Sequence, residues 1–411
     1  MLKVVGALAL VNAISQLLQF LAQPWLAQLY PSSDFGEFAQ LSSVAMFIAV
    51  LATMQFHNYL VMVKNDKYEF DRIFSISMIL SLVASIILCG PIYFLGNSLF
   101  GATAGIGAVI YSSLLVLLIS VGAIVKGGLV AQGDFAGLMW FTLIRSLALV
   151  VTQSFCGWLQ INDGLIAGLV VAEFVALLLA GSFIKRHFSA SVAVGFISSV
   201  RKFFTEKKDF LVIGTIQELV SVATFALPLY MFSRVYGHAF GGQFAMAHKM
   251  SWTPILLVAQ STSSVFFRYL SDKSKEEVKA LRVLNPVYAL LLVCILGGIG
   301  FFVFPVFFGM AFGDGWVEAA TISSWLVIWA ISFLISLPYR LLYRIHSYQR
   351  LQLLIDGIVL TVGLCLFLNV VFEAEQVVFM LSVIGVIQNL ALMLIAYFMI
   401  LRKAQSHQVS P

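Results

Sequence analysis

Apolar residues occupy most of this chain in long runs, and short polar stretches separate one run from the next. A membrane-spanning helix needs about 20 mostly apolar residues, whereas a spanning β-strand needs about ten residues of alternating polarity. Unbroken runs therefore favour helices, in which the backbone satisfies its own hydrogen bonds. The pattern predicts twelve spans, near residues 4–29, 38–61, 73–95, 106–125, 138–159, 165–184, 210–233, 242–266, 286–308, 319–337, 351–370 and 377–400.

Composition supports this interpretation. The 411 residues are 61% hydrophobic and 10% charged, with a mean hydropathy of +0.99. A soluble domain has roughly 25% charged residues. We expect an all-α integral membrane protein without a soluble domain, in which the first apolar run is an uncleaved span. The four cysteines show no CxxC spacing, and neither a zinc site nor a disulfide framework is expected.

The charged residues orient the predicted spans. With both termini in the cytoplasm, nearly all Lys and Arg fall in inner segments, as the positive-inside rule requires. The exceptions are Arg234, in an outer loop, and Arg145 and Lys249, inside spans. Topology thus accounts for the net charge of +5, and no nucleic-acid partner is expected. The outer loops instead carry acids: Asp34, Glu37, Asp163, Asp314, Glu318, Glu373 and Glu375.

The chain divides into two predicted lobes of six helices, residues 1–184 and 210–400, with a cytoplasmic tail at 401–411. A basic linker at 185–209 joins the lobes, and it is equally consistent with an interfacial helix and with an ordinary loop. The lobes echo each other at an offset of 206 residues. Because six is an even number, duplicated halves would enter the membrane in the same sense and enclose a central cleft. The repeated residues are Tyr30, Gly36, Phe38 and Ala39, which return as Tyr236, Gly242, Phe244 and Ala245.

Charged side chains inside spans are costly and usually face a protein interior or a wet cavity. Glu173 and Glu218 are candidates for binding a coupling ion, although a structural ion pair would also explain Glu173. Arg145 and Lys249 suit a phosphate-bearing substrate, but either side chain could reach the interface. Asp356 lies near a span end and is a weaker candidate for ion coupling. His57 and His248 favour structural roles over ligand binding.

Amides form a second group of candidates. Asn12, Gln16, Gln19 and Gln23 recur at helical spacing on one stripe of the first span, and Gln217 precedes Glu218 in the seventh. A single amide in a span can bond two helices together, whereas four in register indicate a hydrated wall. Amides offer donors and acceptors together, which suits sugar hydroxyls. We therefore predict that these residues bind a polar, partly anionic molecule.

Three segments carry a resemblance to a known family. They are LAQPWLAQLYPSSDFGEFAQLSSVAMFIAVLATMQFHNYLV, LPLYMFSRVYGHAFGGQFAMAHKMSWTPILLVAQSTSSVFF and FGDGWVEAATISSWLVIWAISFLISLPYRLLYRIHSYQRLQLL. The chain resembles the Wzx-type O-antigen flippases of the multidrug/oligosaccharidyl-lipid/polysaccharide superfamily. This resemblance implies that an undecaprenyl-pyrophosphate-linked glycan moves from the inner to the outer leaflet of the bacterial inner membrane by alternating access. It also implies a coupling proton or sodium ion, no cofactor, and partners such as a polysaccharide polymerase or chain-length proteins.

Two other classes of function are considered. An ion-coupled multidrug antiporter of the same superfamily predicts an acidic, aromatic pocket for organic cations, and the span residues Arg145 and Lys249 count against it. A membrane enzyme, such as a glycan polymerase or acyltransferase, needs acid, base or nucleophile groups gathered at one accessible face. The short outer loops gather no carboxylate pair with a histidine. We therefore expect a transporter.

Overall fold

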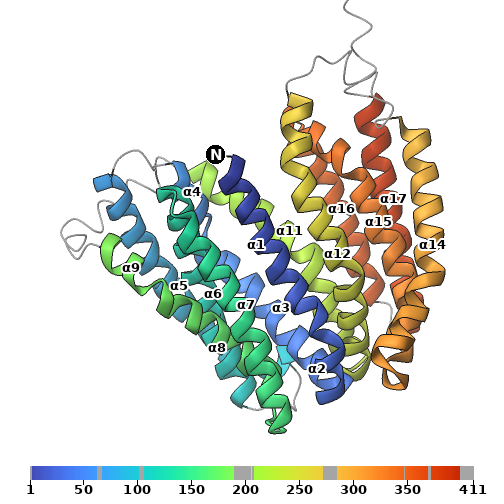
Figure 1. Ribbon diagram of the computed structural model, residues 1–411, viewed down its shortest axis with the longest axis horizontal. Helices are drawn as coiled ribbons and strands as arrows, with labels where there is room; N and C mark the ends of the chain where they lie inside the picture. The colour runs from blue at the N-terminus through green and yellow to red at the C-terminus, as the bar shows by residue number, and fades with distance from the viewer. Residues whose placement is uncertain are drawn as a thin grey trace, which may run out of the picture. The chain divides into compact units, whose positions relative to one another are not determined.

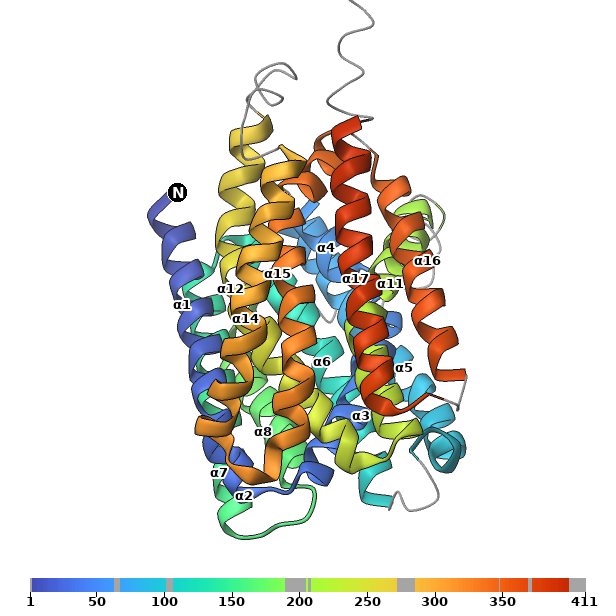
Figure 2. The same cartoon turned by 90° about the vertical axis from the view of Figure 1, so that its right-hand side faces the viewer.

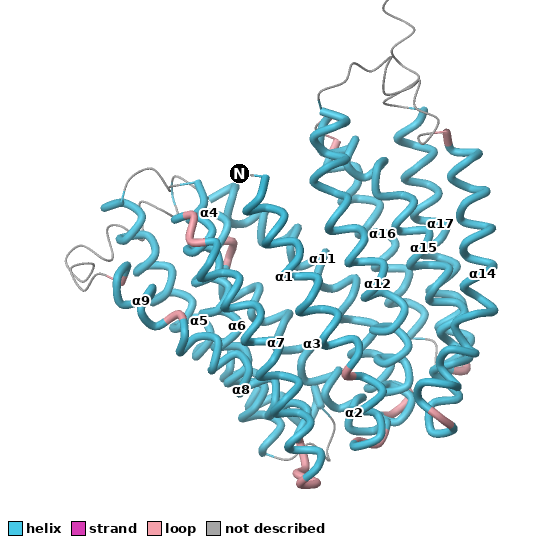
Figure 3. Tube along the Cα trace, in the orientation of Figure 1, coloured by secondary structure: helices cyan, strands magenta, loops and turns pink. Residues whose placement is uncertain are grey.

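The computed structural model describes residues 2–62, 67–100, 106–188, 205, 208–271, 285–346, 348–368 and 372–398. These residues form helices and connecting turns, and no strand occurs among them (Figure 3). The helical class expected from the apolar runs is confirmed for this part of the chain. The predicted tail at 401–411 and most of the predicted linker, residues 189–204 and 206–207, lie outside the described residues.

The chain forms two compact units, Met1–Gly242 and Gln243–Pro411. The helices of each unit can be followed in Figure 1. The first unit contains α1 (Leu2–Leu21), α2 (Gln23–Leu29), α3 (Ser32–Thr53), α4 (Phe56–Met62), α5 (Lys67–Phe100), α6 (Ile106–Gln132), α7 (Phe135–Trp158), α8 (Gly164–Leu179), α9 (Gly181–His187) and α11 (Lys208–Val235). The second contains most of α12 (His238–Ser271), α14 (Pro286–Phe312), the 3₁₀ turn η3 (Asp314–Trp316), α15 (Val317–Ile345), α16 (Gln349–Leu368) and α17 (Ala374–Ile395).

Ten helical segments of the described chain are long and apolar enough to cross a membrane. The bent pair α8 and α9, which changes direction by 52°, makes an eleventh if it is one span. Each predicted span overlaps one of these segments, except that the predicted span 242–266 falls on α12, which does not meet the same measure of apolarity. The structure therefore supports a multi-pass membrane protein, while twelve spans and cytoplasmic termini stay predictions.

Two predicted spans differ from the helices in their course. The span expected at 38–61 is broken, because Met54 and Gln55 adopt left-handed backbone angles between α3 and α4. The span expected at 106–125 continues to Gln132 as part of α6, so Lys126 lies within a helix and not in a loop. The break places Gln55 between two helices, and the longer α6 places Lys126 inside a helix.

In the first unit, α3 and α6 form the centre. α5, α8 and α11 pack against α3, and α4 and α8 pack against α6, while α1 packs along α7. A core of Phe56, Phe70, Phe74, Phe141 and Phe183 joins α4 to α9. Tyr30 ties the turn after α2 to α7, because its hydroxyl donates to the carbonyl oxygen of Gln153 at 2.7 Å. These contacts fix the relative register of α1, α6, α7 and α8.

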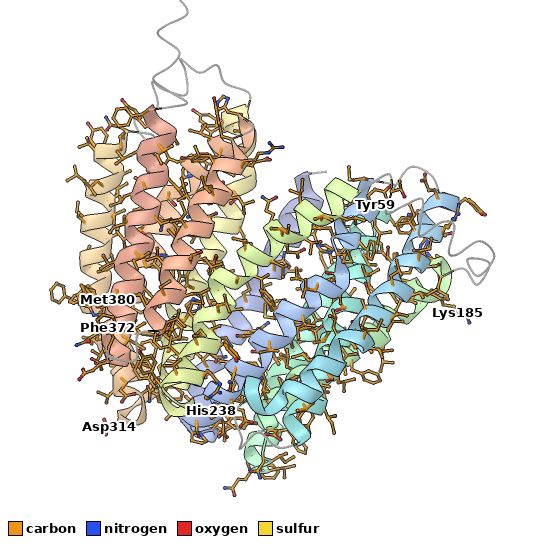
Figure 4. All side chains as sticks on the ribbon, turned by 180° about the vertical axis from the view of Figure 1, so that it is seen from behind. Tyr59, Lys185, His238, Asp314, Phe372 and Met380 are labelled. Carbon is orange, nitrogen blue, oxygen red and sulfur yellow. The ribbon has the colours of Figure 1, made fainter. Side chains whose placement is uncertain are left out.

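In the second unit, α15 packs between α14 and α17, and α16 packs against α17 (Figure 2). Trp252 of α12 meets Trp329 of α15 edge to face, with ring centroids 5.2 Å apart. Asp314 and Phe372 lie at the same end of this unit, where the chain turns into α15 and α17 (Figure 4). Gln243 of α12 donates to the carbonyl oxygen of Gly315 and accepts from the backbone of Ala319 at this end.

The repeat in the sequence has a counterpart in the first unit. α3 begins at Ser32 and α12 begins at His238, which is the same offset of 206 residues. A Cβ atom added at Gly36 would collide with the carbonyl group of His238, and one added at Gly242 would collide with that of Ser32. Each contact therefore becomes the other when the two repeats are exchanged. Such reciprocity is the mark of a two-fold relation between the two helix starts.

Candidate functional site

Arg145 of α7 and Glu173 of α8 form an ion pair. Nη2 and Nε of Arg145 lie 2.6 Å and 2.7 Å from Oε1 of Glu173. The Glu173 side chain is 5% exposed and that of Arg145 is 28% exposed. Gly122 of α6 leaves space beside the other carboxylate oxygen. Of the two interpretations of Glu173, the geometry matches the structural ion pair, and it commits part of the Arg145 guanidinium to a partner within the unit.

The amides of the predicted stripe fall on α1 and on the start of α2. Gln19 of α1 donates to the Ser146 hydroxyl of α7 at 2.8 Å, beside Arg145 in sequence, and the buried Gln23 of α2 donates to the carbonyl oxygen of Gln19 at 2.7 Å. Gln16 is half-buried and Asn12 is exposed. The stripe therefore runs from a packed polar seam at Gln19 and Gln23 to the exposed side chain of Asn12.

The opposite side of α1 is apolar and exposed. Asn12 follows Leu10 by two positions, or about 200° around the helix. The amides thus avoid the face that an acyl chain would contact, and α1 has one lipid-compatible stripe and one polar stripe. The exposed apolar residues of this face are Leu10, Ile14, Leu17 and Leu21.

A cavity of about 430 Å³ lies within the first unit. α3, α4, α6 and α11 supply its walls, and a volume of this size is within the range of ligand pockets. Most of the lining is apolar, and the polar groups are His57, Asn58, Lys126 and Glu218, with Thr53 beside them. Of the residues proposed from sequence, only Glu218 lines this cavity.

A chain of hydrogen bonds holds Glu218 in the cavity wall. Gln55 donates to Oε2 of Glu218 at 2.6 Å and to the carbonyl oxygen of Gly214 at 3.0 Å. Asn58 in turn donates to Oε1 of Gln55 at 2.6 Å. Nε2 of His57 lies 3.8 Å from Oε1 of Glu218, and Nδ1 of His57 is buried without a hydrogen-bond partner in the described chain. Both carboxylate oxygens of Glu218 therefore face polar groups of α4 or the break before it.

The broken span produces this arrangement. Met54 and Gln55 have φ angles of 40° and 64°, in the left-handed region that residues other than glycine rarely adopt. The Gln55 carbonyl then accepts from the backbone of Asn58 and Tyr59 and starts α4, while its side chain reaches α11. Strained backbone of this kind persists only where the surrounding contacts determine it.

Met54→Gly is expected to destabilise the protein only slightly, because glycine relieves a strain of about 1 kcal/mol or more at the positive φ but loses the packing of the half-buried Met54 side chain against the core. Gln55→Gly relieves the same strain but removes the amide that bonds Gly214 and Glu218, so it is expected to destabilise. The midpoint of thermal unfolding of each purified variant measures its change in stability. Equal shifts in the same direction would contradict a positioning role for the Gln55 amide.

Lys126 projects into the cavity from α6 and is exposed there. It makes no hydrogen bond or ion pair to any residue in the described ranges. Sequence reasoning missed it, because the predicted span ended at residue 125 and assigned Lys126 to an inner loop. Gly127 and Gly128 favour a helix end when read from sequence, and only the structure shows that they let α6 continue and pack closely against His57 and Phe74.

Asp356 belongs to a polar network inside the second unit. Gln388 of α17 donates to Oδ1 of Asp356 at 2.6 Å, and Nη1 of Arg340 lies 3.7 Å from the same oxygen. Arg340 and Ser332 bond the side chain of Asn389 at 2.8 Å each. Arg340, Gln388 and Asn389 were not singled out from sequence. Their bonds connect α15, α16 and α17 at one level.

The remaining proposed residues have few contacts. Gln217 is exposed on α11, one position before Glu218. Lys249 is half-buried on α12 in the second unit and makes no hydrogen bond or ion pair with a described residue. His248, next to it, stacks on Trp252 with centroids 5.7 Å apart. Within the described ranges no group of three or more His, Cys, Asp or Glu side chains is arranged to hold a metal ion.

Comparison with known proteins identifies a family and a fold. A family model described as "Polysaccharide biosynthesis protein" matches residues 1–274. No curated protein matches the chain. Several solved structures share 14–16% sequence identity with the chain. At this low identity their likeness shows the fold alone, and that fold is similar to that of MOP superfamily transporters.

Three solved structures illustrate this fold. The lipid II flippase MurJ, in an inward closed conformation, has a TM-score of 0.73 at 14% identity, over 95% of this chain and 87% of that one. An inward-facing multidrug resistance MATE family transporter of the MOP superfamily has a TM-score of 0.69 at 15% sequence identity, over 97% of this chain and 100% of that one. A MOP superfamily transporter from Pyrococcus furiosus has a TM-score of 0.54 at 16% sequence identity, over 97% of this chain and 95% of that one.

Proposed function

The chain belongs to the polysaccharide biosynthesis protein family, and we propose that it is a flippase for a lipid-linked oligosaccharide. The substrate is an O-antigen repeat unit on undecaprenyl pyrophosphate, which moves from the inner to the outer leaflet of the bacterial inner membrane. Two six-helix lobes alternate access around a central cleft, and both termini are cytoplasmic. The glycan passes through the protein while the polyprenyl tail stays in lipid.

The observation that carries this proposal is the two-sided surface of α1. One face presents exposed Leu10, Leu17 and Leu21, which suit acyl chains, and the other presents Asn12 and Gln16. A helix that only packed in lipid would not need an exposed amide on its polar face. Amides bond hydroxyl groups without selecting a charge, which suits a neutral sugar. Gln217, exposed on α11, contributes in the same way.

Glu218 is the residue best suited to bind a coupling proton or sodium ion, because it lines a cavity. Glu173 is bonded to Arg145, and Asp356 is bonded to Gln388 and lies near Arg340. These two carboxylates are less available, so we assign them supporting roles. Lys249 remains a candidate for contact with an anionic part of the substrate.

The double variant Asn12→Leu/Gln16→Leu is expected to lower surface O-antigen by roughly tenfold or more, since two amide hydrogen bonds to the substrate at about 1 kcal/mol each are lost. The assay uses a bacterium lacking its own O-antigen flippase, with membrane abundance measured in parallel. Leu10→Ala/Leu17→Ala, on the opposite face, is the matched control and should retain export. Full export by the amide variant would refute the proposal that Asn12 and Gln16 contact the substrate.

The multidrug antiporter alternative is tested in the same cells. Expression of the chain should leave their resistance to cationic dyes unchanged if it carries glycans. A rise in dye resistance that depends on Glu218, with no restoration of O-antigen, would favour the antiporter. Because both measurements use one set of strains, a failure of expression affects them equally and is visible in the abundance assay.

A further inference from the structure

We propose that the cavity of the first unit is a phosphate-binding site in which Lys126 supplies the positive charge. The proposal rests on the flippase function for the source of the phosphate, which would be the pyrophosphate of the carried lipid. Lys126, His57, Asn58 and Glu218 line this cavity together, and the sequence had marked only Glu218 as a candidate.

The first argument is that the Lys126 ammonium group has no hydrogen-bonded or ion-paired partner among the described residues. The group lies within the helix α6, in a segment apolar enough to cross a membrane. A cation in such a place is expected to face water or an anion. An ammonium group carries three donors and acts as a compact point charge toward phosphate oxygens. The cavity is the space into which these donors open.

The second argument concerns which cations are already committed. Arg145 was predicted, together with Lys249, to contact phosphate, but two of its nitrogens bond Glu173 within 2.7 Å. Glu218 has no comparable cation, because its nearest partners are the Gln55 amide at 2.6 Å and the His57 ring at 3.8 Å. Lys126 is attracted by the Glu173 carboxylate but does not form an ion pair with it, so its ammonium group is still available to a ligand.

The third argument is the unpaired polar atom of His57. Nδ1 is buried and has no hydrogen-bond partner in the described chain, while Nε2 faces Glu218. A buried nitrogen without a partner costs about 1–3 kcal/mol, so a ligand that bonds it gains affinity. With Nδ1 protonated and the ring turned about its Cβ–Cγ bond toward the cavity, the ring would donate to a phosphate oxygen. Asn58, which is exposed and bonded to Gln55 through its amide nitrogen, leaves its oxygen free to accept from a hydroxyl.

The shape of the cavity fits an amphipathic ligand. Its volume of about 430 Å³ exceeds what a phosphate group needs, and the rest of the wall is mostly apolar and includes Val50, Val61, Ile119 and Val130. An isoprenyl pyrophosphate places its phosphates at the polar end and its first carbons along the apolar wall.

The test measures binding of farnesyl pyrophosphate to the purified full chain. Lys126→Gln is expected to weaken binding at least tenfold. Glu218→Gln is expected to strengthen it several-fold, because it removes a negative charge from the same cavity. Lys185→Gln is the matched control, since Lys185 is an exposed lysine at the end of α9, and it should bind as the wild type does.

Opposite signs for the two cavity variants cannot arise from loss of folding, which would weaken both. Wild-type affinity in Lys126→Gln, or weaker binding in Glu218→Gln, overturns the site. Inorganic pyrophosphate and vesicles of phosphatidylglycerol are tested as competitors. Lys126-dependent binding of all three supports a general phosphate site and overturns the link to the carried lipid. Intact binding with no glycan export counts against the proposed function and not against the site.

Discussion

Gly36→Ala is expected to destabilise the protein by about 3 kcal/mol and to remove most of it from the membrane. The added Cβ would overlap the carbonyl group of His238, and backbone atoms cannot swing aside as a flexible side chain can. Overpacking of a close-packed interior typically costs about 1–3 kcal/mol, and a clash with backbone lies at the upper end. Gly242→Ala should have the same effect, because its Cβ would overlap the carbonyl group of Ser32.

Membrane abundance and the midpoint of thermal unfolding measure this effect. Gly298→Ala in α14 is the control, because no atom lies within 4 Å of its added Cβ. Alanine should be neutral or slightly stabilising there, as expected of an unobstructed helix position. If Gly36→Ala and Gly298→Ala are equally stable, the close crossing of α3 and α12 does not exist in the membrane. Equal losses at positions 36 and 242 would support the reciprocal contact.

Glu173→Gln is expected to destabilise by about 3–5 kcal/mol, because it leaves the Arg145 guanidinium without its counter-ion inside the helical bundle. Arg145→Gln removes the other partner and leaves the buried Glu173 carboxylate without a counter-ion, so we expect a similar loss of stability. The double variant Arg145→Gln/Glu173→Gln contains no unpaired charge, so it should recover much of the loss. A double-mutant cycle on unfolding midpoints isolates the interaction of the pair.

The same cycle separates structure from transport. If the pair only joins α7 to α8, the double variant should export glycan whenever it is stable. If Arg145 also contacts substrate through the part of its side chain that remains exposed, the double variant should be stable and inactive. Additive effects of the two single changes, with no coupling, would contradict the ion pair itself.

Much of the architecture is predictable from the sequence because the membrane imposes it. An apolar run of about 20 residues in lipid has few alternatives to a helix. The candidate site was less predictable. Met54 and Gln55 are not turn residues, and their left-handed conformation depends on bonds to α11, more than 150 residues away. The ends of helices were also uncertain, which is why Lys126 was assigned to a loop.

Pairings between distant residues could not be read from spacing. Arg145 and Glu173 were each identified as unusual, but only the packing of α7 on α8 shows that they bond each other. Arg340 was counted among cytoplasmic charges, yet it lies in α15 and binds Asn389 on α17. The repeat offset of 206 residues was visible in four residue pairs, and it became interpretable when the helix starts at Ser32 and His238 proved to be in contact.

The sequence by itself determined that this protein is a helical membrane protein with amides on one side of α1, because hydropathy and helical spacing are local properties. The tertiary structure decided which charges are matched and which remain open to a ligand. Glu173 and Asp356 found partners, while Lys126 did not find one among the described residues. The physical reason is that the free energy of a charged group in a membrane depends on its nearest neighbours, and the packing of the helices determines which residues those neighbours are.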